Sequence, residues 1–444
     1  MKHTQFANGF QVIYEKPNST VPLSSVQIIC NVGNIHSPPS LNGVTHFIEH
    51  ICFKGTTLHP DFNKVMMQYV DSGSVFNGFS TQRYTAYVVK CQDIFLPQCI
   101  KILAEELLQS TFALTEFKKE EKVVLEETII DNDNPSHVLN NMAIELLYEN
   151  TPYQYPVDDI SYHQANYDYK KVVVFYKQHY KPSNLIFSIT SNLAFPRIVS
   201  MLKTTVFNKK EKSPLLPGLH DQMLLYLLTP PKIDGVKYQL KHVKKLNSVF
   251  LKIAFQICNQ YDKDKYILNF FASILCNALT GRLTKILRQD YGLVYGIAAT
   301  TSYYECGGDL TISTQFNAES FIKKNKPSVL PLIIHELNKI LKTGLTTSEI
   351  TIFKHNIRGR ILMDLENSDT QTYYNGFAML YQKPDDIVPY ADLYKTYYEP
   401  ITKAQLNACI RQYICLKRMC VAVLGNEIPP LPLIAKECNK LVNI

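Results

Sequence analysis

The chain has 444 residues, of which 46% are hydrophobic and 19% are charged. This balance excludes a disordered chain and is typical of a globular protein with a large buried core. The formal net charge of +7 comes from scattered lysines. It does not form the basic patch expected of a nucleic-acid-binding protein, so we expect no nucleic-acid partner.

The cysteines and the N-terminus bear on the compartment. The eleven cysteines are widely spaced and include no C-x-x-C pair, which indicates reduced thiols rather than a disulfide framework. The N-terminus lacks the apolar segment of a signal peptide, and no apolar run is long enough for a transmembrane helix. We therefore expect a cytoplasmic protein that is not bound to a membrane.

The first predicted elements are two strands and a helix. Residues 10–15 alternate apolar and polar side chains after an Asn-Gly turn signal, and residues 23–32 resemble a second strand. The segment GVTHFIEHICFKG (residues 43–55) has the apolar side chains of a helix. It follows the turn-prone residues 38–43 and closes with Gly55.

This predicted helix carries two histidines and a glutamate at the spacing of a zinc site. His46 and His50 share one helix face, with Cβ atoms about 5–6 Å apart. Glu49 can reach a water molecule on a metal ion that the two imidazoles hold. The inverted H-x-x-E-H pattern is typical of zinc hydrolases in which the carboxylate is the general base. The alternative is two helix histidines that cap polar groups, and so short a pattern does not decide by itself.

An acidic helix is the next element with chemical content. The acidic helix is predicted at residues 116–130. Before it we predict a helix at 61–71, strands at 75–79 and 84–91, and a helix at 94–108. Glu120 and Glu127 lie on one face of the acidic helix, and carboxylates on an apolar face need a cation or hydrogen-bond donors. A metal ion would meet that need, whereas the alternative is a solvated acidic face. Periodicity alone does not choose between Glu126 and Glu127.

The remaining elements indicate a linker and a repeat. Helices at 136–148 and 169–180 and a strand at 184–191 complete the first half, and residues 208–235 carry the Lys and Pro clusters of a linker. The segment FYKQHYKPSNLIFSITSN (175–192) matches CIRQYICLKRMCVAVLGN (409–426) in its order of helix end, turn and strand. The strand predicted at 248–257 parallels the one at 23–32. We predict two copies of one α+β domain, at 1–207 and 236–444.

Taken together, these segments are similar to the insulinase/pitrilysin family of zinc peptidases, most closely to its half-length, mitochondrial-processing-peptidase-like branch. The similarity covers nearly the whole chain. It includes ANGFQVIYE (7–15), GVTHFIEHICFKGT (43–56), NGFSTQRYTAY (77–87), EEKVVLEETI (120–129) and GRLTKILRQDYGLVYGI (281–297).

The resemblance implies the metal ligands and the general base. The family's third ligand is a glutamate about 76 residues past the second histidine, and 76 residues separate His50 from Glu127. His46, His50 and Glu127 would then hold one Zn²⁺ per chain. Glu49 would be the general base, and Glu120 would match a family glutamate that assists the catalytic water.

The resemblance also implies residues that bind the substrate. Arg288 and Tyr295 match a pair that would hydrogen-bond the substrate carbonyl and its developing oxyanion. Without the family match, they would be interpreted as a helix-terminal arginine and a tyrosine packed in a strand. Asn77 matches an asparagine that reaches the substrate main chain. Its segment departs from the family in Gly78, where alanine is usual, and in Arg83, where an acid is usual, so the resemblance does not extend to support of this strand by that acid.

The fold and reaction follow from the same resemblance. We expect two homologous domains per chain, each a mostly antiparallel sheet backed by helices, in a processing-peptidase-like clamshell. Two identical or similar chains would enclose a chamber. The expected activity is zinc-dependent endopeptidase cleavage of peptides or unfolded protein segments. The alternatives are a zinc hydrolase for other substrates and a non-catalytic scaffold or partner subunit, although such relatives typically lose the zinc motif that this chain retains.

Overall fold

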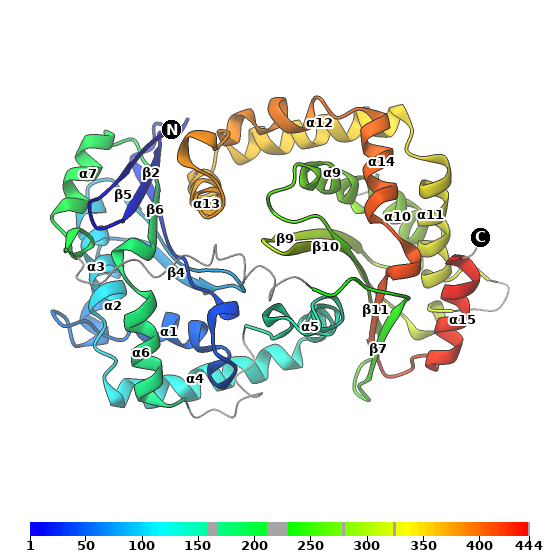
Figure 1. Cartoon of the computed structure of the whole chain (residues 1–444), viewed down its shortest axis with the longest axis horizontal. Coiled ribbons are helices and arrows are strands. Elements are labelled where there is room, and N and C mark those ends of the chain that lie inside the picture. Colours follow the sequence, from blue (N-terminus) through cyan, green and yellow to red (C-terminus); the bar gives the residue numbers. More distant parts are fainter. Residues whose placement is uncertain (158–166, 211–229, 278–279, 323–325, 443–444) are drawn as a thin grey trace. The chain divides into compact units, whose positions relative to one another are not determined.

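The strands and helices fall into two compact units, which are described separately below. The computed structural model (Figure 1) describes residues 1–157, 167–210, 230–277, 280–322 and 326–442. The first unit comprises Met1–Ile130, Tyr155–Leu219 and Arg360–Leu393, and the second comprises Asp131–Gln154, His220–Gly359 and Tyr394–Ile444.

Each unit is built on one sheet. The first has the order β1-β2-β6-β3-β5-β4, with strands at Lys2–Gln5, Gln11–Glu15, Leu185–Thr190, Leu23–Cys30, Thr85–Gln92 and Val75–Ser80. The second has the order β7-β11-β8-β10-β9, with strands at Lys237–His242, Cys420–Gly425, Val249–Ile257, Gly307–Phe316 and Ile297–Tyr304. Apart from β1 the two orders are the same. In each sheet one pair is parallel, β2 with β6 and β7 with β11, and the other pairs are antiparallel. The predicted α+β repeat is confirmed.

One face of each sheet shares an apolar core with helices of its own half. In the first unit these are α1 (Val44–Cys52), α2 (Phe62–Asp71), α3 (Leu96–Gln109), α4 (Leu114–Asp133), α6 (Tyr169–His179) and α7 (Phe195–Lys203). In the second they are α9 (Asp264–Cys276), α10 (Arg282–Thr284), α11 (Val329–Thr343), α12 (Thr347–Asp364), α14 (Lys403–Tyr413) and α15 (Leu431–Val442). No helix in the described part of the chain is long and apolar enough to cross a membrane.

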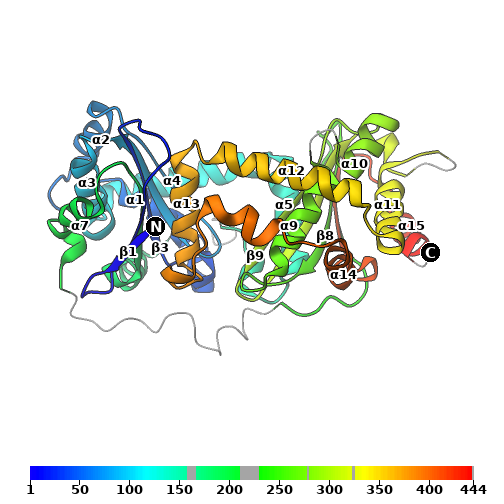
Figure 2. The same ribbon diagram turned by 90° about the horizontal axis from the view of Figure 1, so that it is seen from above.

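The other face of each sheet is covered by a helix from the opposite half of the sequence. Helix α13 (Ser368–Met379) packs on β3 and β6 of the first sheet, and α5 (Pro135–Leu147) packs on β8 and β11 of the second (Figures 1 and 2). The sheets thus fall within the predicted ranges 1–207 and 236–444, whereas the compact units exchange these two helices. Of the predicted linker, residues 211–229 lie outside the described residues.

The elements predicted in the first half are all present, with ends that differ by at most three residues. The apolar patterning that predicted them reflects the cores they enter, because buried positions recur at helix or strand spacing. Strand β1 and helix α7 were not predicted, although α7 is a clearly amphipathic helix of nine residues.

Gly376 lies where α13 approaches the first sheet most closely. A Cβ atom at this position would lie 2.5 Å from Oε1 of Gln27 and 3.1 Å from side-chain atoms of Ile29 and Ser188. Gly359 is also helical, but a Cβ atom there would meet nothing within 4 Å. The two glycines form a matched pair for testing this packing.

We predict that Gly376→Ala lowers the free energy of unfolding by about 1–3 kcal/mol, because the added methyl group overpacks the interface. Gly359→Ala should raise it by up to about 1 kcal/mol, because alanine favours the helix. Denaturant unfolding of both variants measures the difference. Equal changes would contradict the close packing of α13 on the sheet.

Candidate metal centre

The candidate centre is built on helices α1 and α4. Phe47 of α1 and Phe117 of α4 are fully buried, and their rings meet edge to face with centroids 4.6 Å apart. Glu120 and Glu127 follow Phe117 at helical spacing, three and ten residues later, and so lie on the same stripe of α4. The packing of these two helices therefore brings both glutamates to the histidines of α1.

His46, His50 and Glu127 form a triangle of donor atoms. The Nε2 atoms of the two histidines lie 3.1 Å apart. Oε2 of Glu127 lies 3.7 Å from Nε2 of His46 and 3.2 Å from Nε2 of His50. Zinc bonds of about 2.0–2.1 Å in tetrahedral geometry put neighbouring donors about 3.3 Å apart, so the three residues fit a zinc ion with a fourth position open. Within the described ranges, no other cluster of metal-ligating side chains has this geometry.

The surroundings shift the pKa values of the two imidazoles in opposite directions. Burial, followed by the nearby charge of His50, lowers the pKa of His46 to about 4, so its ring is neutral and its lone pair is available at neutral pH. Burial also lowers the pKa of His50, but its hydrogen bond to Glu120 and the charges of Glu127 and Glu49 outweigh this effect and raise it. The carboxylates thus create a site that attracts positive charge.

Glu120 positions His50. Its Oε1 lies 3.0 Å from Nδ1 of His50, which directs the opposite ring nitrogen, Nε2, toward the donor triangle. Its Oε2 lies 3.0 Å from the ammonium group of Lys54. Burial would raise the pKa of Glu120, but the hydrogen bonds from His50 and Lys54 lower it overall. These contacts are those of a residue that orients a metal ligand, and the predicted role of Glu120 in assisting the catalytic water stays a prediction.

Glu49 is almost fully buried beside the histidines. Its Oε2 accepts a hydrogen bond of 2.8 Å from the hydroxyl of Ser80 in β4. A Cβ atom at Gly78 would lie 2.7 Å from Oε1 of Glu49, so the glycine at this position leaves room for the carboxylate against the strand. The departure from the family's alanine thus lies in contact with the predicted general base.

Strand β4 presents Asn77 at the edge of the first sheet. Asn77 is exposed, and its Oδ1 accepts a hydrogen bond of 2.9 Å from the amide of Gly78. Arg83, found in place of the usual acid, is buried and donates to Oδ1 of Asn31. The turn between β4 and β5, which contains Arg83, is therefore held to the end of β3 by a buried guanidinium bound to a side-chain amide oxygen.

Arg288 and Tyr295 lie together in the second unit. The guanidinium of Arg288 sits over the ring of Tyr295, with Cζ 5.2 Å from the ring centre. Tyr295 is 88% exposed and belongs to no strand, so it is not the packed strand tyrosine of the alternative interpretation. It lines a pocket of about 670 Å³ together with Gly292–Gly296 and the end of β10.

The sequence analysis assigned no role to Lys54 or Ser80, although the position of Lys54 in the sequence could have suggested one. It lies four residues after His50, and a buried carboxylate such as Glu120 needs a cation. Ser80 could be recognised only from the fold, because it reaches Glu49 across the gap between β4 and α1. Cys52 is fully buried in the apolar core of the first unit.

Two family models match the chain. Residues 12–159 match the model described as insulinase (peptidase family M16), and residues 166–357 match the one described as the peptidase M16 inactive domain. The first range contains the donor triangle, and the second contains Arg288 and Tyr295.

Named proteins and solved structures agree with these matches. The uncharacterized zinc protease YmxG of Bacillus subtilis is 26% identical over 370 residues, which cover 83% of this chain and 85% of YmxG. A protease from Helicobacter pylori has a TM-score of 0.85 at 17% identity, covering 96% of this chain and 99% of that one. A chain of complex III2 from Candida albicans has a TM-score of 0.80 at 12% identity, covering 98% and 99%. At these identities the two structures share the fold alone.

The ligand assignment predicts a graded loss of zinc. Glu127→Gln should weaken zinc binding most, because it replaces a ligand. Glu120→Gln should weaken it by roughly 10–100-fold, as loss of an outer-shell partner does. Glu126→Gln, an exposed neighbour on α4, is the control and should leave affinity unchanged. Competition with a chelating dye measures all three, and equal affinities of the Glu126 and Glu127 variants would contradict the assignment.

Proposed function

Because the chain belongs to the insulinase family of peptidases, we propose that it is a zinc-dependent metalloendopeptidase that cleaves peptides or unfolded protein segments. The observation that carries this proposal is the donor triangle of His46, His50 and Glu127, with the carboxylate of Glu49 beside it. When bound there, one zinc ion would supply a Lewis acid for a water molecule and for the scissile carbonyl.

Glu49 is the general base of the proposed reaction. Its carboxylate takes a proton from the attacking water and later delivers it to the leaving amine. The hydrogen bond from Ser80 to Oε2 orients the carboxylate, and the glycine at position 78 leaves room for Oε1 against the strand. Burial of Glu49 keeps bulk water from competing for this proton.

Strand β4 is the proposed binding edge for the substrate. It is the last strand of its sheet, and its outer edge has no partner strand among the described residues. An extended peptide can add to such an edge through main-chain hydrogen bonds, with Asn77 contributing side-chain contacts. A folded protein cannot supply an extended segment of this kind, which supports peptides and unfolded segments as substrates.

Arg288 and Tyr295 are the proposed donors to the substrate carbonyl. The guanidinium and the phenol both donate hydrogen bonds, and such donors lower the barrier where negative charge develops on the oxygen. The stacking of Arg288 on Tyr295 limits the freedom of both side chains before substrate binds.

A non-catalytic scaffold is the second candidate. It is supported by the description of the second family model as an inactive domain and by the fold likeness to complex III2. The retained ligands and general base favour the peptidase, and the following experiment separates the two candidates.

We predict that Glu49→Gln keeps its zinc and loses peptide cleavage by roughly two to four orders of magnitude, because only the proton acceptor is removed. Cleavage of a mixed peptide library is followed by mass spectrometry, and zinc content by elemental analysis. Glu126→Gln serves as the control and should retain both properties. Cleavage by the Glu49 variant at the wild-type rate would remove Glu49 from the mechanism. No cleavage by the zinc-loaded wild-type chain would favour the scaffold.

We also predict that Tyr295→Phe lowers turnover by about 10²–10³-fold, as loss of one oxyanion donor does. Its zinc content and unfolding midpoint should stay unchanged, because Tyr295 is exposed and belongs to the second unit, whereas the proposed metal ligands belong to the first. Tyr291→Phe, which removes the hydroxyl of a half-exposed tyrosine nearby, is the matched control. Equal turnover of the two variants would show that Tyr295 takes no part in the reaction.

A further inference from the structure

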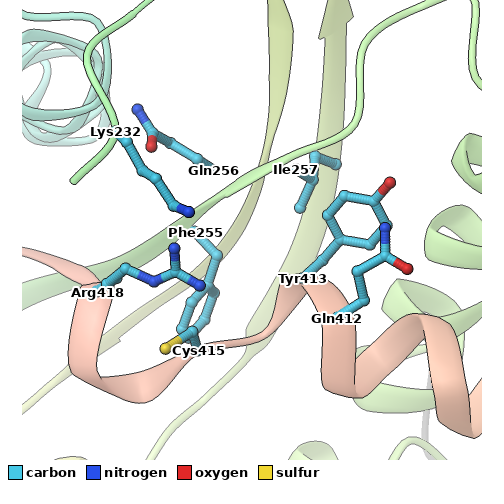
Figure 3. Close-up of a pocket in the computed structure, with 8 residues that line it drawn as sticks. All are labelled: Lys232, Phe255, Gln256, Ile257, Gln412, Tyr413, Cys415 and Arg418. Carbon is cyan, nitrogen blue, oxygen red and sulfur yellow. The ribbon is translucent and has the colours of Figure 1, made fainter. Parts of the chain in front are cut away.

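A pocket beside β8 in the second unit has no role in the proposed reaction. It has a volume of about 240 Å³ and lies between the end of β8, the segment before β7 and the turn that follows α14 (Figure 3). Its lining differs from that of the pocket beside Tyr295, with which it shares no residue.

The pocket exists because β8 extends beyond its partner strand. Strand β11 pairs with β8 only as far as Cys420 opposite Ala254, and β8 continues to Ile257. In the first sheet the corresponding strands end together, with Cys30 of β3 opposite Leu185 of β6. The overhang of β8 thus forms a wall that the first unit lacks.

Two basic side chains, Lys232 and Arg418, line this pocket, and no acidic residue of the described chain does. Figure 3 shows their charged ends directed into the same space beside Phe255. Neither forms an ion pair within the described ranges. Tyr413 is the lining residue that contacts acids among the described residues: its hydroxyl points away from Arg418 and donates to Asp262 at 3.4 Å. Two like charges that share a pocket repel one another, and a bound anion would relieve this repulsion.

Gln256 fixes the position of Lys232. Its Nε2 donates to the carbonyl of Pro231 at 3.1 Å, and its Oε1 accepts from the amide of Ile233 at 3.2 Å. These residues flank Lys232, so the lysine backbone is tied to β8 where its side chain enters the pocket. The side-chain amide of Gln256 acts as a clamp and is not available to a ligand.

The other walls are also held in place. The amide of Arg418 donates to the carbonyl of Cys415 at 2.9 Å, which closes the turn that carries the guanidinium. Phe255 and Ile257 belong to the apolar core of the second unit and form a rigid floor. The pocket therefore combines two basic side chains, each on a backbone segment held by hydrogen bonds, with an apolar surface.

We propose that this pocket binds a small phosphate monoester. A phosphate group carries about two negative charges near neutral pH, which matches the two cations. The guanidinium of Arg418 can bind two phosphate oxygens in parallel, and Lys232 can reach a third as a point charge. The volume lies below the roughly 300–1,000 Å³ of sites for drug-sized ligands, so the organic part must be short.

Isothermal titration calorimetry of the zinc-loaded full chain with phenyl phosphate tests this proposal. One phenyl phosphate should bind per chain, and Lys232→Gln and Arg418→Gln should each weaken binding by about 10-fold or more, since each removes charged hydrogen bonds. Arg418→Lys should fall between wild type and Arg418→Gln, because it keeps the charge and loses the two-pronged geometry. Lys417→Gln removes a neighbouring exposed lysine that does not line the pocket, and it should bind as wild type does.

The comparison ligands and variants separate this site from others. Binding that is equally strong in wild type and in Lys232→Gln would place the phosphate elsewhere, for example at the zinc, and overturn the proposal. Preference for succinate over phenyl phosphate at matched ionic strength would overturn the phosphate assignment. Lys232 is exposed, so Lys232→Gln provides the test even where Arg418→Gln does not fold. Absence of binding at millimolar phenyl phosphate would also overturn it.

Discussion

The metal centre depends on the contact between α1 and α4. The pattern on α1 supplies two ligands, and the third comes from a helix that begins more than sixty residues later. The rings of Phe47 and Phe117 hold the helices together, but an apolar contact tolerates rotation. The buried carboxylate of Glu120 does not tolerate such a rotation, because a rotation would leave it unpaired at a cost of several kcal/mol. Its contacts with His50 and Lys54 fix the rotation of α4 and hence the position of Glu127.

The sequence predicted those parts of this site that are local or that repeat a known spacing. His46, Glu49 and His50 lie within one helical turn, so helix periodicity alone placed them together. The choice of Glu127 over Glu126 needed the family resemblance, because acids occur on several faces of α4. In the structure Glu126 is exposed, whereas Glu127 turns toward both imidazoles.

The contacts around Glu49 and Glu120 could not be predicted in the same way. Gly78 and Ser80 act on Glu49 only because β4 runs beside α1, and strand order cannot be read from the spacing of residues. The general need of Glu120 for a cation was predictable, but the sequence suggested that a metal ion would meet it. The structure assigns that role to Lys54, together with the far ring nitrogen of His50.

The two copies show how one scaffold can carry different sites. Their exchanged helices are held by matched polar contacts: Asp369 of α13 with Ser25 and Lys90, and Asn140 of α5 with Lys252. An apolar helix face fits either sheet, so such part-buried polar pairs select the partner, which is why the exchange escaped prediction. With the scaffold fixed, the ends of the central strands are free to differ. In the first copy β3 ends level with β6, and the chain after it leads into the helix that carries the histidines. In the second copy β8 runs past β11, and the pocket beside it is lined by two basic side chains that form no ion pair among the described residues. A difference in strand length thus accompanies a difference in the side chains that gather at the strand ends.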